Sequence, residues 1–381
     1  MNLRKNLGRV ASTIVATALL ASVATVPAFA AGDPQFTGST QADGNYVVNM
    51  TKELHMDEDL YQPTETFEFE VNKYVHGADE VHEVIEGIPV SDGKDNGVTV
   101  ANAVFTTGTT KQTTANVQIT VNKTAFSEAG IYKYTLSEKT GTNTNIDYDD
   151  STKYLYVYVK NNDDMTDVEI YGVVVKDYTT GDEGAVTVGD KDSKFENTYG
   201  KVNEENVLHN VTLTKTLSGD AANLEQEFPF TITITNTTQD SQIFKIWNDG
   251  DGDGVEVSDE VSTITANGTG ATYQLGNGET VKIFGLRDGD TYTIQEGNMS
   301  SENNGKTNDG YTVKINNGAT NNGQHQDTLA EEDAEEISVT YDNNRTSVSP
   351  TGIAMNVAPY ALLVVVAVAG CFVFLRKRNE D

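Results

Sequence analysis

The chain has 381 residues, with 57 acidic side chains against 26 basic ones and a formal net charge of −31. This balance argues against nucleic acid as a partner, because phosphates are neutralised by lysine and arginine. The single cysteine, Cys371, lies in an apolar segment near the C-terminus, so disulfides do not hold the rest of the chain together.

The first 30 residues combine basic residues, an apolar stretch and the small-x-small sequence Ala28-Phe29-Ala30. This is the pattern of a secretory signal peptide. We therefore expect residues 1–30 to be removed on export and the mature chain to begin at Ala31.

The exported part shows short runs of alternating apolar and polar residues, bounded by Gly, Asn and Asp, and no long helical period. Its length, about 320 residues, is too large for one β-sandwich and suits two. The sequence therefore predicts an all-β fold of two tandem sandwiches. The clearest predicted strands are Thr66–Val71, Tyr154–Val159, Glu169–Val175, Phe228–Thr235 and Tyr311–Ile315.

A polar stretch, Thr198–Asn210, separates two halves that repeat one pattern. Each half begins with a strand that contains a lysine, continues with a Tyr-Thr-x-x-Glu strand and closes with an aromatic-x-Asn strand. We expect one domain over residues 31–201 and a second over residues 202–346.

The repeated lysine, glutamate and asparagine share strand parity with apolar neighbours and should point inward. A lone buried charge is costly, so each residue by itself is more simply interpreted as a strand-end side chain reaching solvent or as half of a buried ion pair. The repetition of the whole set favours a chemical role. The six residues are Lys52, Glu138 and Asn197 in the first half and Lys215, Glu296 and Asn343 in the second.

Such a set can form an isopeptide bond: the desolvated lysine loses its proton and attacks the asparagine carboxamide, while the glutamate moves protons and polarises the carbonyl. We therefore predict Lys52–Asn197 and Lys215–Asn343 cross-links, with Glu138 and Glu296 as catalysts. Each reaction happens once and releases ammonia, so the protein is not expected to be an enzyme. Each link would also carry tension between the termini of its domain.

Two motifs carry a resemblance to a known family: "LTKTLSGDAANLEQEFPFTITI", Leu213–Ile234, and "GLRDGDTYTIQE", Gly285–Glu296. They resemble the backbone pilins of Gram-positive bacteria, in which Ig-like sandwiches of the collagen-adhesin B type carry Lys-Asn isopeptide bonds. The resemblance covers about 300 residues and implies two Ig-like domains. It also implies a structural subunit of a covalently polymerised pilus, or fimbrium.

The C-terminal region has the order of a wall-sorting signal. The pentapeptide Val348-Ser349-Pro350-Thr351-Gly352 precedes an apolar segment, residues 353–375, and a basic tail, residues 376–381. The pentapeptide resembles the Leu-Pro-x-Thr-Gly signal but departs from it at the first two positions. The resemblance implies that a pilus-specific sortase cuts after Thr351 and joins it to a lysine of the next subunit; the alternative is a plain membrane anchor preceded by a turn.

The resemblance also places the acceptor lysine a few residues before the cross-linking asparagine. Lys191 and Lys194 fit this position, with Lys176 in reserve. Lys194 has the opposite parity to Asn197 and should point outward. For either residue the alternative is an ordinary solvated lysine.

One further stretch, Asp249–Glu260, fits the calcium-loop pattern D-x-D-x-D-G-x5-E. Its candidate ligands are Asp249, Asp251, Asp253 and Glu260. The flanking sequences predict strands rather than helices, so an Asp/Gly-rich hairpin tip is the alternative. No other cofactor is expected.

Motifs of hydrolases and nucleotide-binding enzymes are absent from the sequence. The expected partners are a pilus sortase, further copies of the chain, minor pilins, peptidoglycan and a host surface ligand. We expect a location on the cell wall after transient membrane anchoring. The alternative function is a monomeric, sortase-anchored adhesin.

Overall fold

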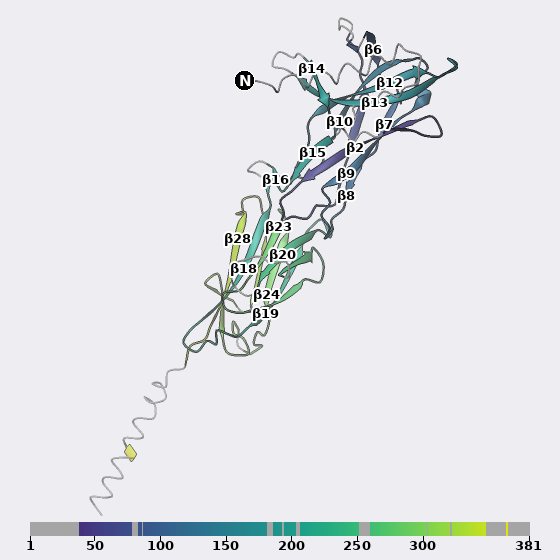
Figure 1. Cartoon of the computed structure of the whole chain (residues 1–381). Helices are drawn as coiled ribbons and strands as arrows, with labels where there is room; N and C mark the ends of the chain where they lie inside the picture. The colour runs from purple at the N-terminus through teal and green to yellow at the C-terminus, as the bar shows by residue number, and fades with distance from the viewer. Residues whose placement is uncertain are drawn as a thin grey trace, which may run out of the picture.

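The computed structural model describes residues 38–347 except 78–82, 86, 181–185, 193, 203–205, 251–259, 303 and 321, together with Leu363 and Val364. The described residues between 38 and 347 form β-strands with one short 3-10 helix, η1 (Lys123–Ala125), so the predicted all-β class is confirmed. Leu363 and Val364 are helical. Figure 1 shows two β-sandwiches arranged end to end.

The predicted signal peptide, the pentapeptide Val348–Gly352 and the basic tail lie outside the described residues, as does nearly all of the predicted apolar span. Among the residues that are described, no helix has the length and apolar character needed to cross a membrane.

The first sandwich consists of two facing sheets. One has the order β11-β15-β2-β9-β7, with β1 beside β2, and the other has the order β14-β13-β12-β10-β6-β5, with β4 beside β10. The strands of the first sheet are β1 (Ser39–Thr40), β2 (Tyr46–His55), β7 (Val98–Val100), β9 (Thr114–Val121), β11 (Ile146–Asp147) and β15 (Lys194–Tyr199). Those of the second are β4 (Phe69–Lys73), β5 (Val84–Ile85), β6 (Ile88–Asp92), β10 (Gly130–Glu138), β12 (Thr152–Asn161), β13 (Val168–Thr180) and β14 (Val186–Lys191).

Two short pairs complete this half of the chain: β3 (Glu65–Phe67) with β8 (Ala103–Phe105), and β16 (Lys201–Val202) with β17 (Asn206–Val207). The predicted strand Thr66–Val71 is wrong in one respect, because β3 and β4 are separate strands. β3 pairs with β8 whereas β4 pairs with β10, so the chain changes partner at Glu68.

The second sandwich has one sheet of order β21-β20-β23-β18-β28-β25-β26 and one of order β22-β19-β24-β27. The first contains β18 (His209–Ser218), β20 (Ile243–Asp249), β21 (Val261–Thr265), β23 (Thr280–Leu286), β25 (Thr312–Ile315), β26 (Gly318–Ala319) and β28 (Glu336–Asn344). The second contains β19 (Phe228–Thr235), β22 (Ala271–Leu275), β24 (Thr291–Glu296) and β27 (Gln324–Thr328).

Each sandwich has its own hydrophobic core, because alternate residues of its strands face inward. In β2 and β18 buried and partly exposed residues alternate along the strand. No described strand pairing joins the two sandwiches, and the sheets of the first end where β15 ends, at Tyr199. The exact boundaries at residues 201 and 202 stay predictions.

The two sandwiches touch through the loop that follows β2. Leu60 from this loop packs against Gly200 and Gly285, where a Cβ would lie 2.6 Å and 2.5 Å from its methyl groups. Both glycines have positive φ, +103° and +78°. Glycine at these positions therefore allows both the turn and the close approach of Leu60.

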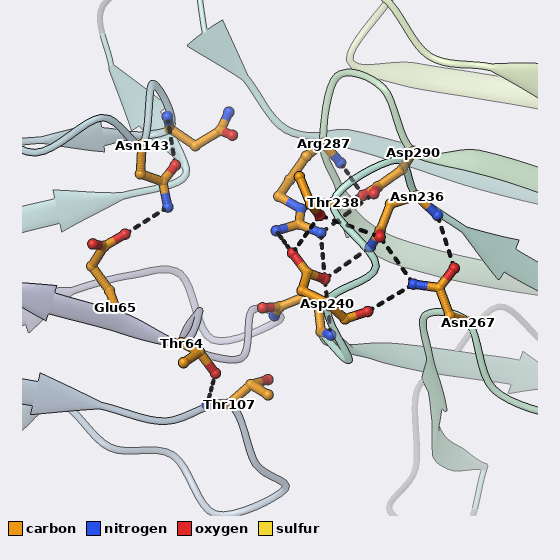
Figure 2. A network of polar contacts seen from close by, with 12 residues as sticks. Thr64, Glu65, Thr107, Asn143, Asn236, Thr238, Asp240, Asn267, Arg287 and Asp290 are labelled. Carbon is orange, nitrogen blue, oxygen red and sulfur yellow. Dashed lines mark hydrogen bonds and ion pairs between the residues drawn. The ribbon is translucent and has the colours of Figure 1, made fainter.

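Polar contacts surround this apolar contact. Lys245 pairs with Asp59 at 2.6 Å, and Gln242 donates from its side chain to the carbonyl of Tyr61. Figure 2 shows the neighbouring network, in which the guanidinium of Arg287 donates two hydrogen bonds to Asp240, at 2.9 Å and 3.0 Å. The interface between the sandwiches thus combines the apolar contact of Leu60 with polar contacts made by Lys245 and Gln242.

The Arg287–Asp240 pair predicts a specific response to acid. Burial would raise the pKa of Asp240, but hydrogen bonds and charge from Arg287 outweigh it and lower that pKa to about 2. A carboxylate with a lowered folded pKa stabilises the fold above its unfolded value, 3.8, and this contribution is lost as the pH falls toward 2.

We therefore expect Arg287→Gln to remove part of the loss of thermal stability that the wild-type chain shows between pH 4 and pH 2. Melting curves across this range measure the effect. Lys160→Gln is the matched control, because Lys160 pairs with Glu169 on the exposed surface. An unchanged acid response in Arg287→Gln would contradict the assignment.

Candidate cross-linking sites

The lysine and asparagine of each domain lie on adjacent parallel strands. In the first domain β2 pairs with β15, and Asn197 lies opposite Leu54, two residues after Lys52. In the second, β18 pairs with β28, and Asn343 lies opposite Leu217, two residues after Lys215. The offset is identical, so both pairs of side chains project from neighbouring positions on the inner face of a sheet.

The first site brings all three predicted residues together. The ammonium of Lys52 contacts Glu138 Oε2 at 2.6 Å, and Asn197 Nδ2 donates to Glu138 Oε1 at 2.6 Å. Glu138 is the last residue of β10 in the opposite sheet. The carboxyl group therefore bridges lysine and asparagine across the core.

This first site is shielded from solvent and lies in the core. Lys52 and Asn197 are 0% and 1% exposed, and the side chain of Glu138 is fully buried. The ring of Phe67 lies 4.9 Å from the Lys52 nitrogen. Burial lowers the pKa of Lys52 and raises the pKa of Glu138, although their mutual attraction opposes both changes.

The second site has the same three residues in a looser arrangement. Asn343 Nδ2 donates to Glu296 Oε1 at 2.5 Å, while Lys215 Nζ lies 3.6 Å from the same oxygen. All three residues are 0% exposed. The nitrogen of Lys215 lies 4.6 Å from the centre of the Phe228 ring, so its surroundings are aromatic.

Three buried atoms at this second site have no hydrogen-bond partner among the described residues: Lys215 Nζ, Glu296 Oε2 and Asn343 Oδ1. At 3.6 Å the Lys215–Glu296 contact is too long for a hydrogen bond, so the attraction between them is mainly electrostatic. Burial lowers the pKa of Lys215 to about 8 and raises the pKa of Glu296. A neutral amine beside a neutral carboxylic acid is the form that such surroundings favour.

One group of the first site has no signature in the amino-acid sequence. The backbone N–H of Asp149 donates to Asn197 Oδ1 at 2.7 Å. A donor at this oxygen would stabilise negative charge that develops when the carboxamide is attacked. Any residue type supplies a backbone N–H, so only the fold reveals this contact.

The candidate acceptor lysines occupy different environments. Lys191 is exposed at the end of β14, an edge strand, whereas Lys194 pairs with Glu53 at 2.8 Å. The hydrogen bond from Lys194 to Glu53 raises the pKa of Lys194. Lys176 lies in β13, opposite Lys191.

Two of the four candidate calcium ligands, Asp251 and Asp253, lie outside the described residues. Asp249 ends β20 and is buried, and Glu260 accepts a hydrogen bond from Trp247 Nε1 at 3.1 Å. Calcium binding by this loop stays a prediction. A second cluster of residues that could bind a metal is largely exposed and consists of Glu53, His55 and Glu196. Its two glutamates form ion pairs with Lys194.

Comparison with known families gives a separate match for each domain. Residues 48–200 match the family described as "Spy0128-like isopeptide containing domain", and residues 209–345 match a domain of unknown function (DUF7601). The first match spans β2 to β15 and so includes Lys52, Glu138 and Asn197. The first domain therefore resembles this family over the segment that contains all three residues of the first site.

A larger part of the chain, spanning both domains, also resembles known pilins. A curated pilin of Streptococcus pyogenes serotype M1 is 26% identical over 274 residues, which cover 70% of this chain and 73% of the relative. The crystal structure of a major pilin from Streptococcus pyogenes matches with a TM-score of 0.53 and 17% identity, covering 79% of this chain and 99% of that chain. Another major pilin of that organism, T3.2, matches at 0.51 and 21% identity over 79% of this chain and 98% of its own. The predicted resemblance to Gram-positive backbone pilins is confirmed.

The lowered pKa of Lys215 predicts how a variant that lacks its partner asparagine responds to alkali. In Asn343→Ala the lysine cannot be cross-linked and remains titratable. Because its folded pKa, about 8, lies below the unfolded 10.5, the unfolded chain binds more protons between these values, and stability rises with pH there.

We expect the second domain of Asn343→Ala to gain thermal stability from pH 8 to pH 9.5. The double variant Lys215→Met, Asn343→Ala is the matched control, since it lacks the titrating amine and retains the tyrosines. Identical pH profiles for the two variants would contradict a depressed lysine pKa.

Proposed function

We propose that the protein is the backbone subunit of a covalently polymerised pilus, and that each domain is locked by a Lys-Asn isopeptide bond. The observation that carries the proposal is the pair of buried Lys-Glu-Asn sets with one strand register, Lys52 beside Asn197 and Lys215 beside Asn343. The resemblance to pilins of Streptococcus pyogenes supports it.

The reaction uses groups already in contact. In the apolar core a proton moves from the lysine ammonium to the glutamate, leaving a neutral amine and a carboxylic acid. The amine attacks the carboxamide carbon of asparagine while the glutamic acid protonates the carboxamide oxygen. The resulting glutamate takes a proton from the attacking nitrogen and passes it to the leaving nitrogen, and it recovers the hydroxyl proton as the carbonyl re-forms. One C–N bond forms, one breaks, and ammonia leaves.

The links give each domain resistance to force. Lysine and asparagine lie on the first and last long strands of their sandwich, so tension entering at one end crosses the covalent bond to the other. The closed loops, residues 52–197 and 215–343, each exceed 100 residues. In the chain-entropy model, a cross-link of this kind stabilises the domain by about 5 kcal/mol.

Subunits would be joined when a sortase cleaves after Thr351 and transfers that residue to an amine of the next subunit. We favour Lys191 as the acceptor, because its side chain is exposed on the edge strand β14, whereas Lys194 is only partly exposed.

A buried ion pair fixes the backbone beside Lys191. Lys153 is 3% exposed and contacts both Asp177, at 3.1 Å, and Asp192, the residue directly after Lys191. Asp192 in turn accepts a hydrogen bond from the backbone N–H of Lys194 at 3.0 Å. The acceptor lysine would thus project from a rigid segment rather than a loose loop.

A monomeric wall-anchored adhesin is the second candidate, because the same domains and sorting signal would serve it. Detergent-boiled wall extracts separate the two functions: a ladder of high-mass species supports the pilin, and one band supports the adhesin.

The glutamates carry a direct prediction about mass. Glu138→Gln and Glu296→Gln remove the group that shuttles protons, so each should slow cross-linking in its own domain by about 100-fold or more. Intact mass spectrometry of the full chain should show one additional retained ammonia for each variant. Glu225→Gln, on the exposed surface of the second domain, is the control. Complete ammonia loss in Glu296→Gln would show that this residue is not the catalyst.

The acceptor assignment predicts the behaviour of two conservative variants. Lys191→Arg should abolish the polymer ladder, because guanidinium keeps its proton and cannot attack the acyl group. Lys194→Arg should polymerise normally, since arginine can retain the ion pair with Glu53. Both variants should keep the wild-type melting temperature. The reverse pattern of ladders would assign the acceptor to Lys194.

A further inference from the structure

The chain leaves the second sandwich at the end of β28, and the next three residues are hydrogen-bonded to that sandwich. Arg345–Ser347 lie against the turn that follows β18, Ser218–Ala221. We call these two segments together the exit clasp. They are far apart in sequence and adjacent because β18 and β28 are parallel neighbours that end side by side, with Ser218 opposite Asn344.

Hydrogen bonds along the whole length of the exit clasp hold it closed. The N–H of Arg345 donates to the carbonyl of Ser218 at 2.9 Å, and the N–H of Ala221 donates to the carbonyl of Arg345 at 3.0 Å. Further out, the N–H of Ser347 donates to Asp220 Oδ1 at 2.7 Å, and its hydroxyl donates to the other oxygen of that carboxylate. Asp220 thus accepts the hydrogen bonds that lie farthest from β28 along the chain.

The local sequence suits this contact. Gly219 has a φ of +94°, and a Cβ there would lie 2.3 Å from the carbonyl oxygen of Arg345. The guanidinium of Arg345 lies 5.5 Å from the ring centre of buried Tyr311. A glycine, an aspartate and an aromatic ring therefore each favour the closed position of the exit clasp.

The exit clasp lies between Asn343 and the predicted sorting pentapeptide, so it can control how far that pentapeptide reaches from the domain. Ser347 directly precedes Val348, the first residue of the predicted sorting pentapeptide, and Asn343 lies four residues before Ser347. With the exit clasp closed, the tether from Ser347 to Thr351 can extend at most about 14 Å. With it open, the tether starts at Asn343 and can extend about twice as far.

We propose that the exit clasp sets the length and direction of the joint between successive subunits, with Asp220 as the residue that positions the sorting segment. The proposal rests on the proposed function, in which Thr351 is joined to the next subunit. While the exit clasp is closed, neighbouring subunits are held close and bend little. Because Asp220 and Arg345–Ser347 are exposed and their bonds can exchange with water, the exit clasp opens under load, and opening stops at the Asn343 cross-link.

Trypsin reports on the exit clasp without any sortase. Proteases cut segments that have opened locally, and the Arg345–Thr346 bond is a trypsin site inside the exit clasp. In the purified full chain, Asp220→Ala removes two hydrogen bonds at once, which corresponds to at least about a tenfold faster cleavage at this bond. Ser347→Ala removes only the hydroxyl donor and should have a smaller effect.

Asp164→Ala is the matched control, because this aspartate is exposed in a turn of the first domain. Ammonia loss and melting temperature should be unchanged in all variants, which separates an opened exit clasp from a misfolded domain. Equal cleavage of Asp220→Ala and wild type would overturn the proposal.

The assembled pili test whether the exit clasp limits bending between successive subunits. Electron micrographs of Asp220→Ala pili should show a broader distribution of angles between successive subunits than wild-type or Asp164→Ala pili. Unchanged angles would overturn the proposal while leaving the pilin function intact. Absence of a ladder from the wild-type chain would instead overturn the proposed function, and the joint with it, whatever trypsin shows.

Discussion

Desolvation of a lysine is the constraint on which the rest of this structure depends. Lys52 and Lys215 are placed where water cannot reach them, and each is opposed by a glutamate in the facing sheet. A buried ion pair of this kind recovers little of its desolvation cost, and an apolar pair would fill the space as well. The presence of such a pair in both domains is explained if the pair is the starting state of a reaction whose product is neutral.

The fold places the proposed Lys-Asn bonds where they would affect the resistance of each domain to tension. Parallel pairing of the first and last long strands in each sandwich brings a lysine from one end of the domain sequence beside an asparagine from the other. The same pairing sets the exit point of the chain, so the exit clasp directly follows Asn343, the asparagine of the proposed second cross-link. At the other end of the second sandwich, Leu60 and the Lys245–Asp59 ion pair connect it to the first.

The alternation of side chains along each strand was the basis for most of the successful predictions from the sequence. It placed the six polar residues on the inner faces, because period-two alternation in "YVVNMTKEL" or "HNVTLTKTL" leaves few choices of orientation. It failed at Glu68, where the chain changes partner between β3 and β4, since alternation continues through a break in pairing. It could not provide the Asp149 N–H beside Asn197, the ion pair between Lys194 and Glu53, or the exit clasp. Those contacts join segments whose proximity depends on the completed fold.

The central claim is that Lys52 and Lys215 are covalently joined to Asn197 and Asn343. Proteolysis of the full chain followed by tandem mass spectrometry of the peptides tests it most directly. The account predicts one branched peptide containing β2 and β15 segments and another containing β18 and β28 segments, each lighter than the sum of its parts by one ammonia. Recovery of these four segments as separate linear peptides would contradict it.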